Sequence, residues 1–71
     1  MRNEAQEFNF SRNVPPSIEQ VKTYFDLLHV PADEAEVFYF YYQGMDWRNE
    51  MGSAIQDWVM AADEWVWNLE N

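Results

Sequence analysis

A chain of 71 residues without a single cysteine must build its core from side-chain packing alone. Disulfides and thiolate-bound metals, which stabilise many small domains, are not available to it. Aromatic residues make up 18% of the sequence, and each large aromatic side chain can remove roughly 150–250 Å² from water. The sequence therefore predicts one small domain with an aromatic core.

The first predicted helix runs from Ser17 to Leu28. It follows Pro15-Pro16, and Ser17 with Gln20 three residues later is typical of a capping box, in which each side chain satisfies a backbone N–H. The proline at position 31 disfavours helical geometry in the residue before it and so ends this helix.

Two further helices are predicted over residues 32–43 and 53–69. Acidic residues crowd the start of the second helix, where they suit the positive end of the helix dipole, and Gly44 can adopt the left-handed conformation that ends it. Ser53 and Gln56 repeat the capping-box pattern at the start of the third helix.

Apolar residues at three- and four-residue spacing mark the inward face of each predicted helix. They are Ile18, Val21, Phe25 and Leu28 in the first, Phe38, Tyr41, Tyr42 and Met45 in or just after the second, and Ile55, Trp58, Ala62, Trp65 and Leu69 in the third. We therefore expect an all-α fold, a small three-helix bundle over residues 15–71. Residues 1–14 are predicted to be a flexible N-terminal arm. The sequence is compatible both with an extended arm that docks on the bundle and with a disordered one.

Several motifs resemble a small helical module found at the C-terminus of phage and prophage replication or helix-turn-helix proteins. The pattern P-x-x-E-x-V-x-x-Y is followed by A-E-x-F-x-x-Y-Y, a loop tryptophan, D-W and a further tryptophan. The matching residues are Pro16, Glu19, Val21, Tyr24, Ala35, Glu36, Phe38, Tyr41, Tyr42, Trp47, Asp57, Trp58 and Trp65. The resemblance implies a compact accessory domain in a mobile-element setting, without enzymatic activity.

The chain departs from that module in its charge. The loop and third helix of the module are usually rich in lysine, with a Gly-Trp pair in the loop, whereas here Asp46 precedes Trp47 and no Lys or Arg follows Arg48. The formal net charge is −9, which opposes binding to phosphate backbones and anionic membranes and favours basic partners. We expect no direct contact with nucleic acid or membrane.

No residue pattern supports catalysis, a metal site or a cofactor. A single histidine, His29, cannot build a usual zinc site without cysteines or close carboxylates, and the carboxylates sit on exposed helix positions rather than in paired, contrasting environments. No apolar run approaches a membrane span, and no signal peptide begins the chain, so a cytoplasmic location is expected.

Five consecutive aromatic residues, Phe38 to Tyr42, cannot all face the core, because a helix turns roughly 100° per residue. Phe40 must point outward, with Tyr39 at its flank. The same arithmetic places Met60 and Trp67 on the side of the third helix that faces away from the core. Apolar residues rimmed by acids are typical of protein contacts. The predicted partner-binding residues are Tyr39, Phe40, Met60 and Trp67, with Glu36, Asp63 and Glu64 as their rim.

These features predict a small acidic protein-interaction module whose partner is a protein with a basic surface. The main alternative is an acidic nucleic-acid mimic that blocks a DNA- or RNA-binding defence protein of the host. Direct DNA binding is a third, opposed by the missing basic patch. The outward aromatics could also be covered by the N-terminal arm through Phe8 and Phe10, be buried in a homodimer, or be exposed singly, which is normal for surface residues.

Overall fold

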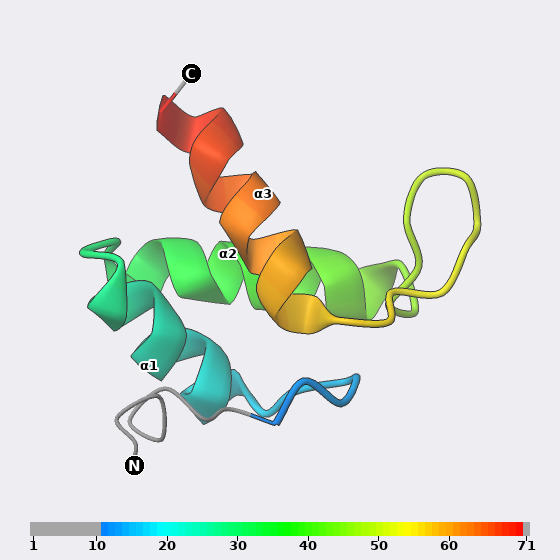
Figure 1. Cartoon of the computed structure of the whole chain (residues 1–71), viewed down its shortest axis with the longest axis horizontal. Helices are drawn as coiled ribbons and strands as arrows, with labels where there is room; N and C mark the ends of the chain where they lie inside the picture. The colour runs from blue at the N-terminus through cyan, green and yellow to red at the C-terminus, as the bar shows by residue number, and fades with distance from the viewer. Residues whose placement is uncertain (1–10, 71) are drawn as a thin grey trace, which may run out of the picture.

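A computed structural model describes residues 11–70 and contains three helices (Figure 1). They are α1 (Ile18–Leu27), α2 (Ala32–Gly44) and α3 (Trp58–Glu70). In this part of the chain, the predicted all-α bundle is confirmed. Figure 1 shows α3 crossing α2, with its C-terminal half extending beyond the other helices. Residues 1–10 of the predicted arm lie outside the described residues.

The capping box predicted for α1 is confirmed. The N–H of Gln20 donates to Ser17 Oγ at 3.1 Å, and the N–H of Ser17 donates to Gln20 Oε1 at 2.9 Å. At the other end, His29 adopts a left-handed backbone with φ of 62°. The N–H of Val30 then reaches the carbonyl of Phe25 at 2.9 Å, which is the long hydrogen bond of a Schellman motif.

Helix α2 ends in the same way, and this corrects the predicted role of Gly44. Gly44 is the last helical residue, and Asp46 adopts the left-handed conformation with φ of 59°. The N–H of Trp47 donates to the carbonyl of Tyr42 at 2.8 Å, and the two side chains stack with ring centroids 5.6 Å apart. The stacked pair supplies the apolar contact that accompanies a Schellman motif.

The prediction that the third helix begins at Ser53 is wrong. Residues 53–55 belong to a loop, in which Asn49 Oδ1 accepts the N–H of Ser53 and the carbonyl of Trp47 accepts the N–H of Ile55. These bonds hold the backbone extended, with one isolated antiparallel bridge between Arg48 and Ala54.

Asp57 is the residue that caps α3. Its Oδ1 accepts the backbone N–H groups of Val59 and Met60 at 3.0 and 3.3 Å, and its Oδ2 accepts from Arg12 Nη1 at 2.6 Å. Burial by itself would raise the pKa of Asp57, but the bond from Arg12 and the two N–H bonds outweigh it and lower that pKa.

The core is contributed by all three helices and by the loop before α3. Its buried members are Val21, Phe25, Ala35, Phe38, Trp47, Trp58, Val59 and Ala62. Each predicted inward stripe contributes at least one residue to this buried core, but some other stripe residues are exposed. Leu69 is exposed, because the last turns of α3 extend past the body of the bundle, and Tyr41 is 41% exposed.

Polar contacts tie the elements together around this core. Tyr24 Oη of α1 donates to Asp63 of α3 at 2.5 Å, and Trp65 Nε1 of α3 donates to Glu34 of α2 at 2.8 Å. Trp58 Nε1 donates to the carbonyl of Ser11 at 2.8 Å. The described part of the predicted arm, residues 11–14, therefore docks on the start of α3.

Comparing variants of the two candidate capping residues, Asp57 and Ser53, tests where α3 begins. We expect Asp57→Ala to lower the free energy of unfolding by about 1–2 kcal/mol, because it leaves two helix N–H groups without their acceptor. Ser53→Ala should change it by less than about 0.5 kcal/mol. Urea unfolding followed by circular dichroism measures both. Equal losses in the two variants would contradict the assignment, and Asp57→Asn, which can still cap, should recover most of the loss.

The contact between α1 and α3 makes stability depend on pH. Burial, and then the hydrogen bond to Asp63, raise the pKa of Tyr24 from 10.0 to about 12. The folded state therefore holds this proton more tightly, so the contribution is complete below pH 10 and is lost as pH rises toward 12. Tyr24→Phe should lower the urea midpoint at neutral pH, and its difference from the parent protein should shrink as pH rises above about 10. A difference independent of pH in both Tyr24→Phe and Asp63→Asn would contradict this coupling.

Candidate functional site

Three of the four predicted aromatic and methionine anchors are strongly exposed. Phe40, Met60 and Trp67 have 61%, 66% and 64% of their surface accessible. The fourth, Tyr39, is half-buried, and its ring lies 5.2 Å from that of Phe40 and 5.8 Å from that of Trp47. Tyr39 is therefore part of the shell around the aromatic core, and it supports Phe40 from behind.

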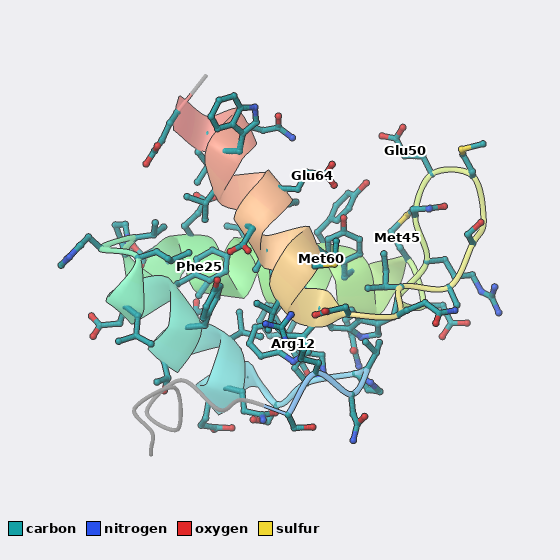
Figure 2. All side chains as sticks on the ribbon, in the orientation of Figure 1. Arg12, Phe25, Met45, Glu50, Met60 and Glu64 are labelled. Carbon is teal, nitrogen blue, oxygen red and sulfur yellow. The ribbon has the colours of Figure 1, made fainter. Side chains whose placement is uncertain are left out.

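Met60 and Trp67 share one side of α3. They are seven residues apart, which is close to two full turns, so their side chains project in nearly the same direction. Trp58 and Ala62, on the other side of the helix, are buried. Met60 is two residues from each of them, a rotation of roughly 200°, so it points away from this buried side; Figure 2 labels its place on α3. We call Met60, Asp63, Glu64 and Trp67 the outer face of α3.

Phe40 lies on a different surface of the molecule. Phe38 and Tyr42 direct their rings toward α3, where they contact Trp65 at 5.4 and 6.3 Å. Phe40 is two residues from each of them, a rotation of roughly 200°, so it faces away from α3. The structure thus brings Met60 and Trp67 together on α3 and places Phe40 on the side of α2 that faces away from α3.

The three predicted rim carboxylates have different surroundings. Glu36 forms an ion pair with Lys22 at 3.1 Å, and Asp63 accepts the hydrogen bond from Tyr24. Glu64 has no ion-pair partner among residues 11–70. On the helix it lies between the direction of Met60 and that of Asn68. Glu64 is therefore the rim residue whose charge is least satisfied by the described chain.

A groove that the sequence did not predict adjoins the outer face of α3. It has a volume of about 310 Å³ and lies between the end of α2, the loop and α3. Its principal lining residues are Tyr41 and Tyr42 from α2, Glu50 and Met51 from the loop, and Glu64 and Asn68 from α3. Figure 2 shows Glu50 and Glu64 extending from the loop and from α3 toward the space between them. We call this the tyrosine groove.

The tyrosine groove is electrostatically negative. Burial, followed by the neighbouring Tyr41 and the carboxylates of Glu64 and Glu50, raises the pKa of Tyr42. No lysine or arginine from the described part of the chain lines the groove. The lysine and arginine residues of that part pair with carboxylates elsewhere: Arg12 with Asp57, Lys22 with Glu36, and Arg48 with Asp46.

A second hollow, of about 450 Å³, lies between residues 14–15, the end of α2 and the loop. Arg48 and Asp46 line it together with Trp47 and Ile55, so it combines both signs of charge with apolar walls. Among the described residues, no group of His, Asp or Glu side chains could hold a metal ion. None of the three helices combines the length and the apolar character needed to cross a membrane.

The groove was missed because its walls come from segments far apart in the sequence. Glu50 and Met51 line the groove from the loop, which Asn49 folds back, with its Oδ1 accepting the N–H groups of Met51 and Ser53 at 2.9 and 3.0 Å. This is an Asx turn, in which the side chain of the first residue accepts the backbone N–H two residues later, and its sequence signal is the asparagine at that first position.

Comparisons with protein-family models, with curated proteins and with solved structures found no match. The resemblance to the phage helical module therefore stays a prediction that rests on the motif residues.

Proposed function

We propose that this protein is a small interaction module, without catalytic activity of its own, that binds a protein through the outer face of α3. The observation that supports this most is the exposure of Met60 and Trp67 on one side of the same helix, flanked by Asp63 and Glu64. Large apolar side chains with a polar rim are the usual composition of a protein interface.

The size of the exposed side chains gives such a face a useful binding energy. Tryptophan is among the residues that dominate interfaces, and truncating one at an interface centre typically costs about 2 kcal/mol or more, roughly a thirtyfold change in affinity. Leu69, which is 51% exposed, lies on the other side of α3, because it is two residues from Trp67 and a helix turns roughly 100° per residue. The apolar side chains that a partner covers in one contact with the outer face of α3 are therefore Met60 and Trp67.

Charge defines the kind of partner. The chain carries a net charge of −9, and each lysine and arginine among positions 11–70 is within 4 Å of a carboxylate. The carboxylates that remain produce a negative field around the outer face of α3, which steers basic proteins toward it and opposes acidic ones.

The outer face of α3 and the opposite side of α2 can be separated by a matched pair of variants. Partners are first captured from a host lysate on the intact protein, and the affinity of each enriched partner is then measured by calorimetry. We expect Trp67→Ala to weaken binding by about thirtyfold or more, and Phe40→Ala to change it by less than about twofold. Both positions are similarly exposed, so each variant removes one exposed aromatic side chain, an indole at position 67 and a phenyl ring at position 40.

Two outcomes would contradict this assignment. One is a partner affinity that does not respond to Trp67→Ala. The other is a homodimer in light scattering that Trp67→Ala converts to a monomer, since the outer face of α3 would then be a self-contact.

A nucleic-acid mimic is the second candidate, and the carboxylate excess in the described structure favours it. Binding of that kind replaces phosphate contacts and should weaken steeply with salt, on the order of a thousandfold between about 50 and 200 mM if six or more contacts are involved. Binding through apolar anchors should change by less than about tenfold. Affinities measured at the two salt concentrations separate the candidates, and a steep slope combined with insensitivity to Trp67→Ala would favour the mimic.

A further inference from the structure

The tyrosine groove has the chemistry of a binding site for a basic side chain. Its volume of about 310 Å³ is at the small end of the range for ligand sites, roughly 300–1,000 Å³. A space of this size suits one side chain of a protein partner.

The aromatic part of the groove is formed by two neighbouring tyrosines. The rings of Tyr41 and Tyr42 have centroids 5.0 Å apart and lie edge to face, with an angle of 86° between their planes. Tyr41 is 41% exposed and Tyr42 is half-buried, so the groove offers ring surface at its opening and further inside. A cation placed over the face of a tyrosine ring is attracted by the ring quadrupole.

The acidic part of the groove is formed by Glu50 and Glu64 on two different elements. Figure 2 shows both residues directed toward the space between the loop and α3. Within residues 11–70, neither glutamate has an ion-pair partner. Two carboxylates beside two tyrosines, with no internal cation, are complementary to a positive group from outside.

Arginine fits this arrangement better than lysine does. A guanidinium is planar, so it can stack on an aromatic ring while its N–H groups donate in pairs to carboxylates, and it is less strongly hydrated than an ammonium group. In the groove, Glu50 and Glu64 come from different elements, and Tyr41 and Tyr42 supply ring surface from α2. This arrangement suits a flat guanidinium, which can donate to both carboxylates while it stacks on a ring.

The groove is continuous with the outer face of α3. Glu64 belongs to both surfaces: it is four residues from Met60 and three from Trp67, which makes it a neighbour of each on the helix. A protein that covers Met60 and Trp67 therefore places its adjacent residues over the groove.

We infer that the tyrosine groove receives an arginine side chain of the protein partner, held over Tyr41 and Tyr42 by Glu50 and Glu64. The inference rests on the proposed function, because the same partner would cover the outer face of α3. The arginine would fix the register of the partner, and Met60 and Trp67 would supply apolar contact.

The test uses the intact protein and two short probes, the peptide Ac-Gly-Arg-Gly-NH2 and its uncharged counterpart with citrulline in place of arginine. Nuclear magnetic resonance titration follows the tyrosine ring signals and the backbone amides of the loop and α3. We expect saturable shifts for the arginine peptide at Tyr41, Tyr42, Glu50 and Glu64, and binding at least tenfold weaker for the citrulline peptide.

Charge-matched variants separate a specific groove from a general acidic surface. Glu50→Gln/Glu64→Gln should weaken the arginine peptide at least fivefold. Glu19→Gln/Asp26→Asn removes the same charge from exposed positions on α1 and should change the affinity less than twofold. Any one of three results would overturn the inference. The two double variants could weaken binding equally, the shifts could spread over the whole acidic surface, or the citrulline peptide could bind as well as the arginine peptide.

The outcome for the groove is distinguishable from the outcome for the proposed function. If partner binding depends on Trp67 but the arginine peptide gives no localised shifts, the groove inference is overturned and the interaction module stands. If partner binding is unaffected by Trp67→Ala, the proposed function fails, and the inference that depends on it is overturned as well.

Discussion

The fold depends on one aromatic side chain, Phe38, at the centre of a small core. Its ring lies 5.4 Å from Phe25 of α1, 5.4 Å from Trp65 of α3 and 6.3 Å from Trp47 of the loop. Every element of the described chain after residue 17 therefore packs on the same ring of α2. In a domain of this size, with no disulfide to restrain the chain, this shared packing centre is what joins the helices to one another.

Two buried tryptophans, Trp47 and Trp58, and the half-buried Trp65 position the segments around this centre. Each of their N–H groups needs a partner once it leaves water, and each finds one that positions a neighbouring segment. Trp58 binds the carbonyl of Ser11 and holds the described end of the arm, Trp65 binds Glu34 and orients α3 on α2, and Trp47 binds Gln43 and holds the loop against α2. The tyrosine groove is a consequence of the last two contacts, because they place the loop and α3 on either side of Tyr41 and Tyr42.

The same constraints explain why the candidate binding surfaces lie where they do. A core made by one face of α2 leaves the far side of that helix, with Phe40, uncovered. The crossing of α3 over α2 leaves the last turns of α3 beyond the other two helices, and Trp67 and Leu69 in these turns are exposed. The exposed apolar residues are thus a result of topology, and their acidic neighbours give the surface its preference for basic groups.

The local features of this protein were determined by its sequence alone. The capping box at Ser17, the buried positions Val21, Phe25, Phe38, Trp58 and Ala62, and the outward direction of Met60 and Trp67 all follow from spacing within a single helix. The tertiary structure decided the features that need two segments at once. Helix α3 begins after Asp57 instead of at Ser53, because Asn49 and Trp47 hold residues 53–55 in the loop and Arg12 bonds to Asp57. Phe40 lies apart from Met60 and Trp67 because of the way α3 crosses α2. The tyrosine groove depends on this crossing and on the fold of the loop before α3. Helix periodicity reports the direction of a side chain around its own axis, but only packing between helices decides which of those directions meet.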